Sequence, residues 1–314
     1  METTLQKQLI DSTKVNVDVL LATFNGEVYL REQLDSLVNQ VGVKINLYVS
    51  DDGSYDLTRQ ILSEYGTKFQ KITFFEGPRK GPAANFFFLL RQANEKYVAF
   101  ADQDDIWERQ HLINSIKSLH NFTDTPALRF SASREFGEST RVKTWPTDSS
   151  LPKFERLLFQ NLARGCTMVL NKSAVQLINS YEPRLAVMHD WWILLQVYVR
   201  GIVIYSNMPE VNYRLHGSNF IGRPEKSHSL NLKQVRKKLH SAIDQAQELL
   251  QVNQLVISTD KRDELSLIAE IPNLKFSQKV RVILFSKKRF RYGFFEEVAL
   301  RIFLVTLRSK KQTH

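Results

Sequence analysis

The sequence has 314 residues, a length that suits one large domain with a smaller appendage. Its hydrophobic fraction of 43% is ordinary for a globular protein, and the single cysteine, Cys166, excludes an internal disulfide and fits a reducing compartment. Of the net charge of +10, residues 275–314 carry +9, from eleven Lys and Arg against two Glu. No apolar run reaches the roughly 18 residues of a membrane span, and the polar residues 1–14 lack the core of a signal peptide, so we expect a cytoplasmic protein.

The first third of the chain alternates between strand and helix patterns. Residues 17–22 are apolar apart from Asp18, as in a strand covered on both faces, and residues 27–39 have apolar side chains at helical spacing. The pattern continues with strands over 44–50, 71–75 and 97–101 and helices over 56–65 and 82–94. This alternation predicts an α/β fold with an open, mainly parallel sheet, whose ligands bind beyond the carboxyl ends of the strands.

The alternation is less regular after residue 107. The predicted elements there are strands over 127–133, 166–170, 202–205 and 210–215, helices over 153–162, 172–181, 189–200 and 230–252, and a linker over 217–229.

Polar motifs follow three of the predicted strands, and the first of them is residues 23–26, after the strand over 17–22. Asp102, Asp104 and Asp105 come after one strand, and Asp51 and Asp52 after another. Like charges this close repel each other, and a divalent cation that takes oxygen ligands is the simplest compensation. Two acidic turns at strand ends therefore predict one site for a metal and a polar ligand.

The motifs carry a family resemblance. In order they are LATFNG at residues 21–26, SDDGS at 50–54, FADQDD at 100–105 and HDWW at 189–192. The chain resembles the family 2 glycosyltransferases, whose nucleotide-diphospho-sugar domain has the GT-A fold. RGCTM at 164–168 and YRLHG at 213–217 resemble the rhamnosyltransferase group of bacterial polysaccharide assembly. The resemblance covers about residues 15–220 and implies a GT-A catalytic domain there, with an N-terminal tail at 1–14 and a basic C-terminal helical region at 221–314.

The resemblance implies which residues bind the nucleotide-sugar donor. They are Thr23, Asn25, Glu27, Asp51, Asp52, Asn85, Asp102, Gln103 and Arg214. A carboxylate can accept two hydroxyl hydrogen bonds, and an arginine can pair with a diphosphate. The alternatives are an ordinary turn for residues 51–54 and an exposed helical position for Asn85.

The resemblance also implies a divalent metal, Mg²⁺ or Mn²⁺, that bridges the donor diphosphate. Asp104 is the expected ligand, and His216 matches a position where some relatives supply another. The alternative is that the acidic residues, Asp105 above all, are capping residues ahead of a helix.

Asp190 is the expected general base, because an inverting transfer needs a carboxylate to take the acceptor's hydroxyl proton. Trp191, Trp192, Arg164 and Gly165 are the expected contacts to the acceptor or sugar. Relatives usually have Glu-Asp where this chain has His189 and Asp190. The alternative is that Asp190 caps a helix and the tryptophans fill the core.

These observations predict an inverting, metal-dependent glycosyltransferase. Its best donor, by resemblance alone, is dTDP-rhamnose, and its acceptor is a hydroxyl of a lipid-linked cell-surface glycan. The basic, apolar tail predicts contact with an anionic membrane surface, at the inner face of a bacterial membrane, or else packing on the catalytic domain. No nucleic-acid motif is present. The alternative functions are a sugar nucleotidyltransferase, which the single glycine of residues 23–26 disfavours, and a silent nucleotide-binding scaffold.

Overall fold

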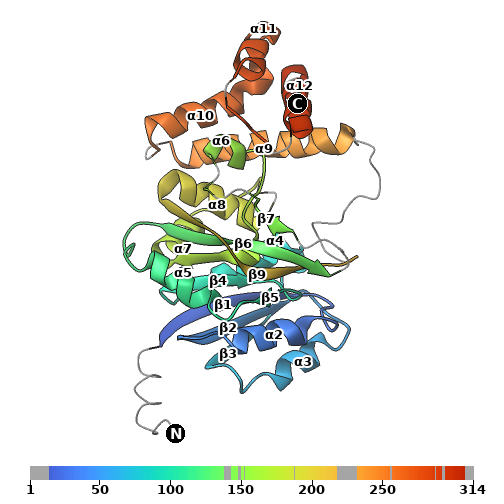
Figure 1. Ribbon diagram of the computed structural model, residues 1–314, viewed down its shortest axis with the longest axis vertical. Coiled ribbons are helices and arrows are strands. Elements are labelled where there is room, and N and C mark those ends of the chain that lie inside the picture. Colours follow the sequence, from blue (N-terminus) through green and yellow to red (C-terminus); the bar gives the residue numbers. More distant parts are fainter. Residues whose placement is uncertain are drawn as a thin grey trace. The chain divides into compact units, whose positions relative to one another are not determined.

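A computed structural model describes residues 14–137, 143–147, 150–151, 153–186, 188–217, 232–254, 257–286, 288–291 and 294–307 (Figure 1). The chain forms two compact units. The first comprises residues up to 151 with 163–180 and 201–223, and the second comprises 152–162, 181–200 and 224–314. The predicted linker lies almost wholly outside the described residues, and the predicted boundaries at 14 and 220 stay predictions.

The first unit is built on a nine-stranded mixed sheet. Its strand order is β3-β2-β1-β4-β8-β6-β9-β5, with β7 paired to β6. The strands are β1 (Val15–Thr23), β2 (Val43–Asp51), β3 (Lys71–Glu76), β4 (Tyr97–Ala101), β5 (Ile106–Trp107), β6 (Ala127–Gly137), β7 (Thr144–Trp145), β8 (Met168–Asn171) and β9 (Ile202–Leu215). Strands β3, β2, β1 and β4 are parallel, as predicted. Beyond β4 the sheet becomes mixed, because β8 is antiparallel to both β4 and β6 while β9 runs parallel to β6.

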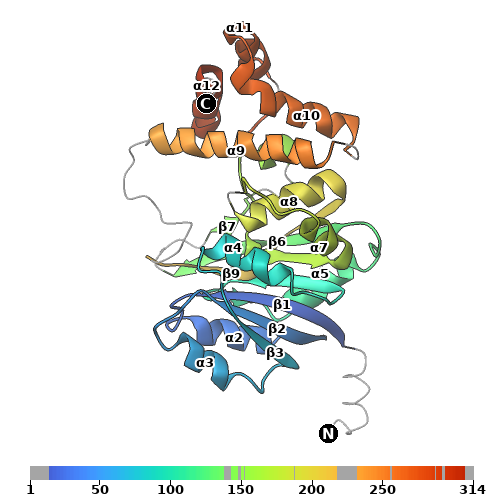
Figure 2. The same cartoon turned by 180° about the vertical axis from the view of Figure 1, so that it is seen from behind.

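Helices cover both faces of this sheet. They are α2 (Leu30–Val38), α3 (Thr58–Glu64), α4 (Pro82–Leu90), α5 (His111–Leu119) and α7 (Lys172–Asn179). Alternate side chains of β1 and β2 join α2, α3 and α5 in one apolar core. On the other face, Phe86 of α4 packs edge-to-face on Phe100 of β4 with 5.7 Å between ring centroids. Asn179 of α7 donates a hydrogen bond to the Leu90 carbonyl of α4 at 3.2 Å, so these two helices share that face (Figure 2).

The second unit is helical in its described part. Its elements are α6 (Phe154–Leu157), α8 (His189–Arg200), α9 (Leu232–Val252), α10 (Thr259–Glu270), η2 (Ile271–Asn273), α11 (Phe276–Lys279), η3 (Val280–Leu284) and α12 (Phe294–Thr306). Buried Asn253 links two of these helices, since it donates to Gln196 of α8 at 3.2 Å and to the Leu249 carbonyl of α9 at 2.8 Å. No helix among the described residues is long and apolar enough to cross a bilayer.

Candidate active site at the carboxyl edge of the sheet

Parallel pairing brings the three predicted motifs to one edge of the sheet. Thr23 at the end of β1 lies in register with Asp51 at the end of β2, and Leu21 of β1 with Ala101 of β4. The segments that follow these strands therefore leave the sheet side by side, as expected for an α/β binding edge.

Asp51 is a hydrogen-bond hub within the protein. Its Oδ2 accepts hydrogen bonds from the hydroxyls of Thr23 at 2.9 Å and Ser54 at 2.5 Å. Its Oδ1 accepts from the backbone amides of Gly53 at 3.2 Å and Ser54 at 2.9 Å and from Arg59 Nε at 2.9 Å. Burial acts to raise the pKa of Asp51, but these hydrogen bonds outweigh it and hold that pKa below its usual range. Asp51 thus fixes the turn, and its contact with a nucleotide stays a prediction.

Arg59 of α3 belongs to this hub, and sequence reasoning missed it. Besides Asp51, its guanidinium binds Glu76 of β3 through two hydrogen bonds of 2.8 Å. These two carboxylates raise the pKa of Arg59 further above its ordinary value. The only signal in the sequence was a basic residue seven positions after an acidic pair, a pattern too common to act on.

Asp52 and Asn85 organise the connection that leads into α4. The Asp52 carboxylate accepts the backbone amides of Arg79 at 3.0 Å and Gly81 at 3.2 Å, both residues with positive φ. Asn85 is 1% exposed and donates to the Ser50 carbonyl at 3.0 Å, so the alternative of an exposed helical position is wrong.

Asn25 and Glu27 join the β1 edge to the loop before α3. Asn25 Oδ1 accepts the Tyr55 amide at 3.1 Å, and Glu27 Oε2 accepts the Leu57 amide at 2.9 Å. Two residues predicted to touch the donor therefore hold the loop before α3, and their contact with the donor stays a prediction.

Gln103 clamps the backbone of Phe24. Its Oε1 accepts the Phe24 amide at 2.9 Å, and its Nε2 donates to the Phe24 carbonyl at 3.0 Å. The side chain imitates a pairing strand and joins the segment after β4 to the segment after β1.

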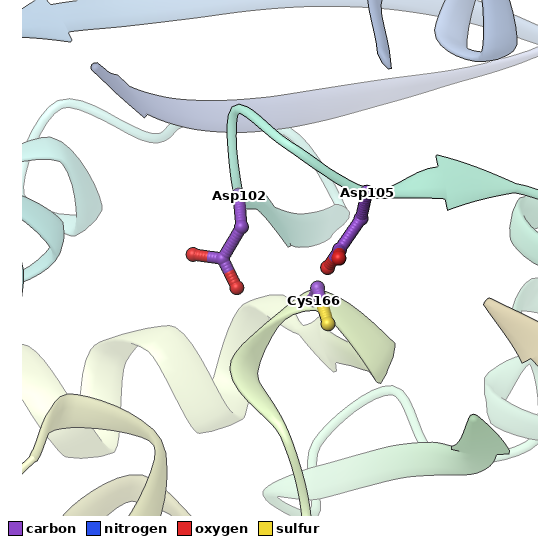
Figure 3. Close-up of side chains that lie close together, drawn as sticks. All are labelled: Asp102, Asp105 and Cys166. Atoms are coloured by element: carbon purple, nitrogen blue, oxygen red, sulfur yellow. The ribbon is translucent and has the colours of Figure 1, made fainter. Parts of the chain in front are cut away.

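Asp102, Asp105 and Cys166 lie together under this edge (Figure 3). One metal-ligating atom of each lies within 4.8 Å of the others, and Figure 3 shows the Asp105 carboxylate directed toward Cys166. Asp105 is fully buried, and its Oδ1 accepts the Arg214 amide at 3.0 Å. Burial, and then the charge of Asp104, raise the pKa of Asp105 to about 7. The nearest following helix, α5, begins only at His111, so Asp105 is not a helix cap.

Asp104 and His216, the two predicted metal ligands, lie in contact. His216 Nε2 is 2.7 Å from Asp104 Oδ2, although 112 positions separate the residues. Arg214 donates from Nε to the Asp104 carbonyl at 2.8 Å, and its guanidinium lies 4.6 Å from the Tyr29 ring centroid. A carboxylate beside an imidazole is a donor set that suits Mn²⁺, so these residues fit the predicted metal.

Arg164 and Gly165 lie in the first unit, on the segment before β8. The Arg164 guanidinium donates to Ser133 at 2.8 Å and Glu135 at 2.6 Å and stacks 3.8 Å above the Tyr213 ring. Gly165 is buried at the start of the short helix η1 (Gly165–Thr167). Their contact with an acceptor or sugar stays a prediction.

The predicted base lies in the second unit, in the first turn of α8. Asp190 is 8% exposed, and its Oδ1 accepts the Trp191 amide at 2.7 Å. The Trp191 indole donates to the Leu157 carbonyl at 2.6 Å, and Trp192 is 1% exposed, so both rings are largely enclosed. Burial lowers the pKa of His189 to about 3, so this neighbour of Asp190 is neutral. The catalytic role of Asp190 and the sugar contacts of the tryptophans stay predictions.

Glu248 of α9 holds the segment that precedes α8, a role that sequence reasoning missed. Its carboxylate accepts the Tyr181 hydroxyl at 2.9 Å and the amides of Arg184 at 2.7 Å and Leu185 at 2.9 Å. The C-terminal region thus contributes directly to the order of the chain just before Asp190.

The family model "Glycosyl transferase family 2" matches residues 18–176, which include the segments after β1, β2 and β4 but not Asp190, Arg214 or His216. The chain belongs to glycosyltransferase family 2. The match confirms the family suggested by the sequence motifs and the prediction that the protein is a glycosyltransferase.

Curated relatives of this glycosyltransferase include the dTDP-rhamnosyl transferase RfbG of Shigella flexneri. It is 29% identical over 216 residues, which cover 64% of the present chain and 73% of the relative. An uncharacterized glycosyltransferase of Rickettsia prowazekii is 24% identical over 208 residues, 64% of each chain, so the match spans less than two thirds of that relative.

Solved structures share the fold of this glycosyltransferase. TarS of S. aureus, residues 1–349 with UDP-GlcNAc, superposes with a TM-score of 0.58 at 15% identity, covering 92% of this chain and 89% of that one. The mannosyltransferase PcManGT of Pyrobaculum calidifontis, in complex with GDP-Man and Mn²⁺, gives 0.53 at 16% identity, covering 82% and 70%. The predicted GT-A fold with a C-terminal helical region is confirmed.

Proposed function

We propose that this family 2 glycosyltransferase is an inverting, metal-dependent enzyme. It transfers rhamnose from dTDP-rhamnose to a hydroxyl of a lipid-linked cell-surface glycan, at the inner face of a bacterial membrane. The observation that carries the proposal is the contact of 2.7 Å between Asp104 and His216, at the edge where the segments after β1, β2 and β4 meet. The choice of donor is supported by the likeness to a dTDP-rhamnosyl transferase.

Asp104 and His216 would hold the metal, with Asp102 on the same loop. When bound, a divalent cation supplies Lewis-acid stabilisation of the charge on the departing nucleoside diphosphate. Arg214, which also pairs with Glu32 at 3.0 Å, would place its guanidinium beside Asp104, where it favours an anionic ligand.

The donor's nucleotide would lie on the edge formed by Thr23, Asn25, Asp51 and Asp52. Because internal hydrogen bonds already occupy the carboxylate of Asp51, this residue acts mainly by fixing the loop that the nucleotide contacts. Each Asp52 oxygen accepts one backbone amide and can accept a further hydrogen bond from the nucleotide. Glu27 and Gln103 fix the same loops, and Asn85 holds the end of β2.

Asp190 would act as the general base. Its carboxylate takes the proton of the acceptor hydroxyl as that oxygen forms a bond to the anomeric carbon. The bond from that carbon to the diphosphate oxygen breaks in the same displacement, so the configuration inverts without a covalent enzyme intermediate. His189, being neutral, leaves the Asp190 carboxylate as the basic group of this turn.

Titration calorimetry with dTDP, UDP and GDP, each with Mn²⁺ or with EDTA, tests the donor and the metal together. We expect dTDP to bind in the presence of metal and to lose that affinity in EDTA and in Asp104→Asn. Tight dTDP binding in EDTA would contradict the metal site, and binding of UDP or GDP alone would contradict the donor.

Transfer assays with Asp190→Asn test the base. We expect the transfer rate to fall by about two or more orders of magnitude while dTDP affinity is unchanged. Glu182→Gln is the matched control, since Glu182 is an exposed carboxylate in the segment before α8. An unchanged transfer rate in Asp190→Asn would refute its assignment. Metal-dependent binding without transfer by the wild type would favour a scaffold, and pyrophosphate release would favour a nucleotidyltransferase.

A further inference from the structure

The C-terminal part of the second unit exposes large apolar side chains in an unusual concentration. Phe285 at the end of η3 is 78% exposed, and Phe294 and Phe295 at the start of α12 are 70% and 86% exposed. We call the aromatic surface the set Leu284, Phe285, Phe294, Phe295, Val298 and Ile302. Single exposed apolar residues are ordinary, but several large exposed ones on two elements that pack together, η3 and α12, mark a surface that meets a partner.

Helix α12 is apolar on two faces. Leu300, Leu304 and Val305 are buried, whereas Phe294, Val298 and Ile302 follow one another at four-residue spacing and are exposed. Residues four apart lie on one side of a helix, so the exposed set forms its own stripe. One apolar face therefore completes the unit, and the other is left for a partner.

Buried Glu297 and partly buried Arg301 of α12 bind backbone groups of η3 and of residues 290–291. Glu297 is 6% exposed, and its carboxylate accepts the amides of Phe290 at 2.8 Å and Arg291 at 2.7 Å and Arg301 Nε at 2.7 Å. Arg301 in turn donates to the carbonyls of Ile283 at 2.7 Å and Leu284 at 3.1 Å. Because these backbone groups are satisfied internally, the aromatic surface is presented by an ordered scaffold.

The charge of residues 275–307, which include the aromatic surface, is positive. Among the described residues of this range, the exposed basic side chains are Lys275, Arg281, Lys288 and Arg289, of which Lys288 pairs with Glu264, and the exposed acid is Glu296. A second copy of the chain would bring like charges together, which opposes association through this surface. An anionic bilayer instead offers opposite charge at its headgroups and apolar chains just beneath.

We propose that the aromatic surface inserts into the headgroup and upper acyl region of an anionic bilayer, with α12 lying in the plane of the interface. This inference deepens the proposed function and rests on it for its purpose, because a lipid-linked acceptor is held at a membrane. Phe285 and Phe295 would be the main apolar anchors, and the neighbouring Lys and Arg would confer the preference for anionic lipid.

Vesicle pelleting of the full chain tests the proposal. The probes are vesicles of phosphatidylcholine alone and of phosphatidylcholine mixed with phosphatidylglycerol. We expect pelleting with the anionic vesicles, and a fall of about tenfold or more in the partition coefficient for Phe285→Ser combined with Phe295→Ser. Arg281→Gln combined with Lys275→Gln should weaken binding to the anionic vesicles and leave binding to the phosphatidylcholine vesicles unchanged.

Phe74→Ser is the matched control, because Phe74 is 51% exposed on β3 of the first unit and should not affect pelleting. Undiminished pelleting of the double Phe variant, or no pelleting of the wild type, would overturn the proposal. A wild-type dimer in gel filtration that the same double variant converts to monomer would also overturn it, in favour of a contact between copies. Calorimetry with dTDP on each variant distinguishes failure of the membrane proposal from failure of the proposed function. The substitutions should leave dTDP binding unchanged whether or not the variants pellet with vesicles.

Discussion

Replacement of Glu210 tests how the β9 strand, which carries Arg214 and His216 at its end, is held in place. Arg129 of β6 donates to both oxygens of Glu210, at 2.6 and 2.9 Å, and Asn114 of α5 donates at 3.0 Å. Arg129 is 4% exposed and Glu210 7% exposed, so water cannot replace either partner. Glu210→Gln would remove the negative charge and leave the Arg129 guanidinium buried without a counterion.

The magnitude follows from two independent routes. Burial acts to raise the pKa of Glu210, but hydrogen bonds from His111 and Arg129 lower it from 4.5 to about 2. Because burial also lowers the pKa of His111 and keeps it neutral, we attribute the effect mainly to Arg129. At about 1.4 kcal/mol per pKa unit, this difference corresponds to about 3 kcal/mol of folding free energy. Removal of one partner of a buried ion pair costs about 3–5 kcal/mol, which agrees.

Urea unfolding of wild type and Glu210→Gln at neutral pH measures this loss directly. The matched control is Glu108→Gln, whose carboxylate is 49% exposed and lies 3.8 Å from Arg134, and we expect it to cost less than about 1 kcal/mol. Equal effects of the two substitutions, or a loss below about 1 kcal/mol for Glu210→Gln, would refute the reasoning.

The same pair predicts a pH dependence. The pKa of Glu210 is lower in the folded protein than in the unfolded chain, so its stabilising contribution is fully present above about pH 5. It is lost as the pH falls from about 5 toward 2, where the folded-state carboxylate also takes a proton. The stability difference between wild type and Glu210→Gln should therefore shrink over that interval.

Three further predictions concern other sites. Asp51→Ala should lower the free energy of unfolding in urea by about 2–4 kcal/mol, because the donors of Thr23 and the Ser54 backbone lose their acceptor. The control is Glu64→Gln, at an exposed ion pair, and a loss for Asp51→Ala no larger than for this control would contradict the role of Asp51 as a hydrogen-bond hub. Glu248→Gln should lower the transfer rate by about tenfold or more at unchanged dTDP affinity, through disorder of the chain before α8; an unchanged rate would assign Glu248 to stability alone. Burial raises the pKa of the Cys166 thiol, so thiol reagents should label it only in denaturant, and labelling of the folded protein would show that the site opens.

Local patterns identified most elements of the parallel half of the sheet. Strand 97–101 and helix 189–200 were predicted with the bounds that the structure has. Helix α5 was missed because its buried face includes His111 and Ser115, polar side chains that obscure the helical apolar pattern. The helix predicted over 153–162 is confined to α6, four residues long, and two predicted strands form the single strand β9 with an irregular register against β6 near Ser131.

The candidate site was predictable in its residue types but not in its internal bonding. The motif identifies Asp51 as a candidate ligand-binding carboxylate. It does not show that Arg59 and Thr23 donate hydrogen bonds to this carboxylate in the folded chain. The contact between Asp104 and His216 spans 112 positions, and no spacing rule in one sequence reveals it. The family resemblance supplied that pairing, whereas Glu248 and Arg59, which matched no motif, were found only in the folded chain.

The two hydrogen bonds between Gln103 and the Phe24 backbone make the motifs at residues 21–26 and 100–105 depend on each other as the sequence evolves. A Cβ atom added at Gly26 would collide with the Gln103 amide, which is the flexible end of that side chain. Any larger residue at 26 therefore expels the amide and releases the backbone of Phe24. A shorter residue at 103 would relieve the collision but would not restore the two hydrogen bonds. Recombination between family members should tolerate exchange of these two segments as a pair and penalise exchange of either one alone.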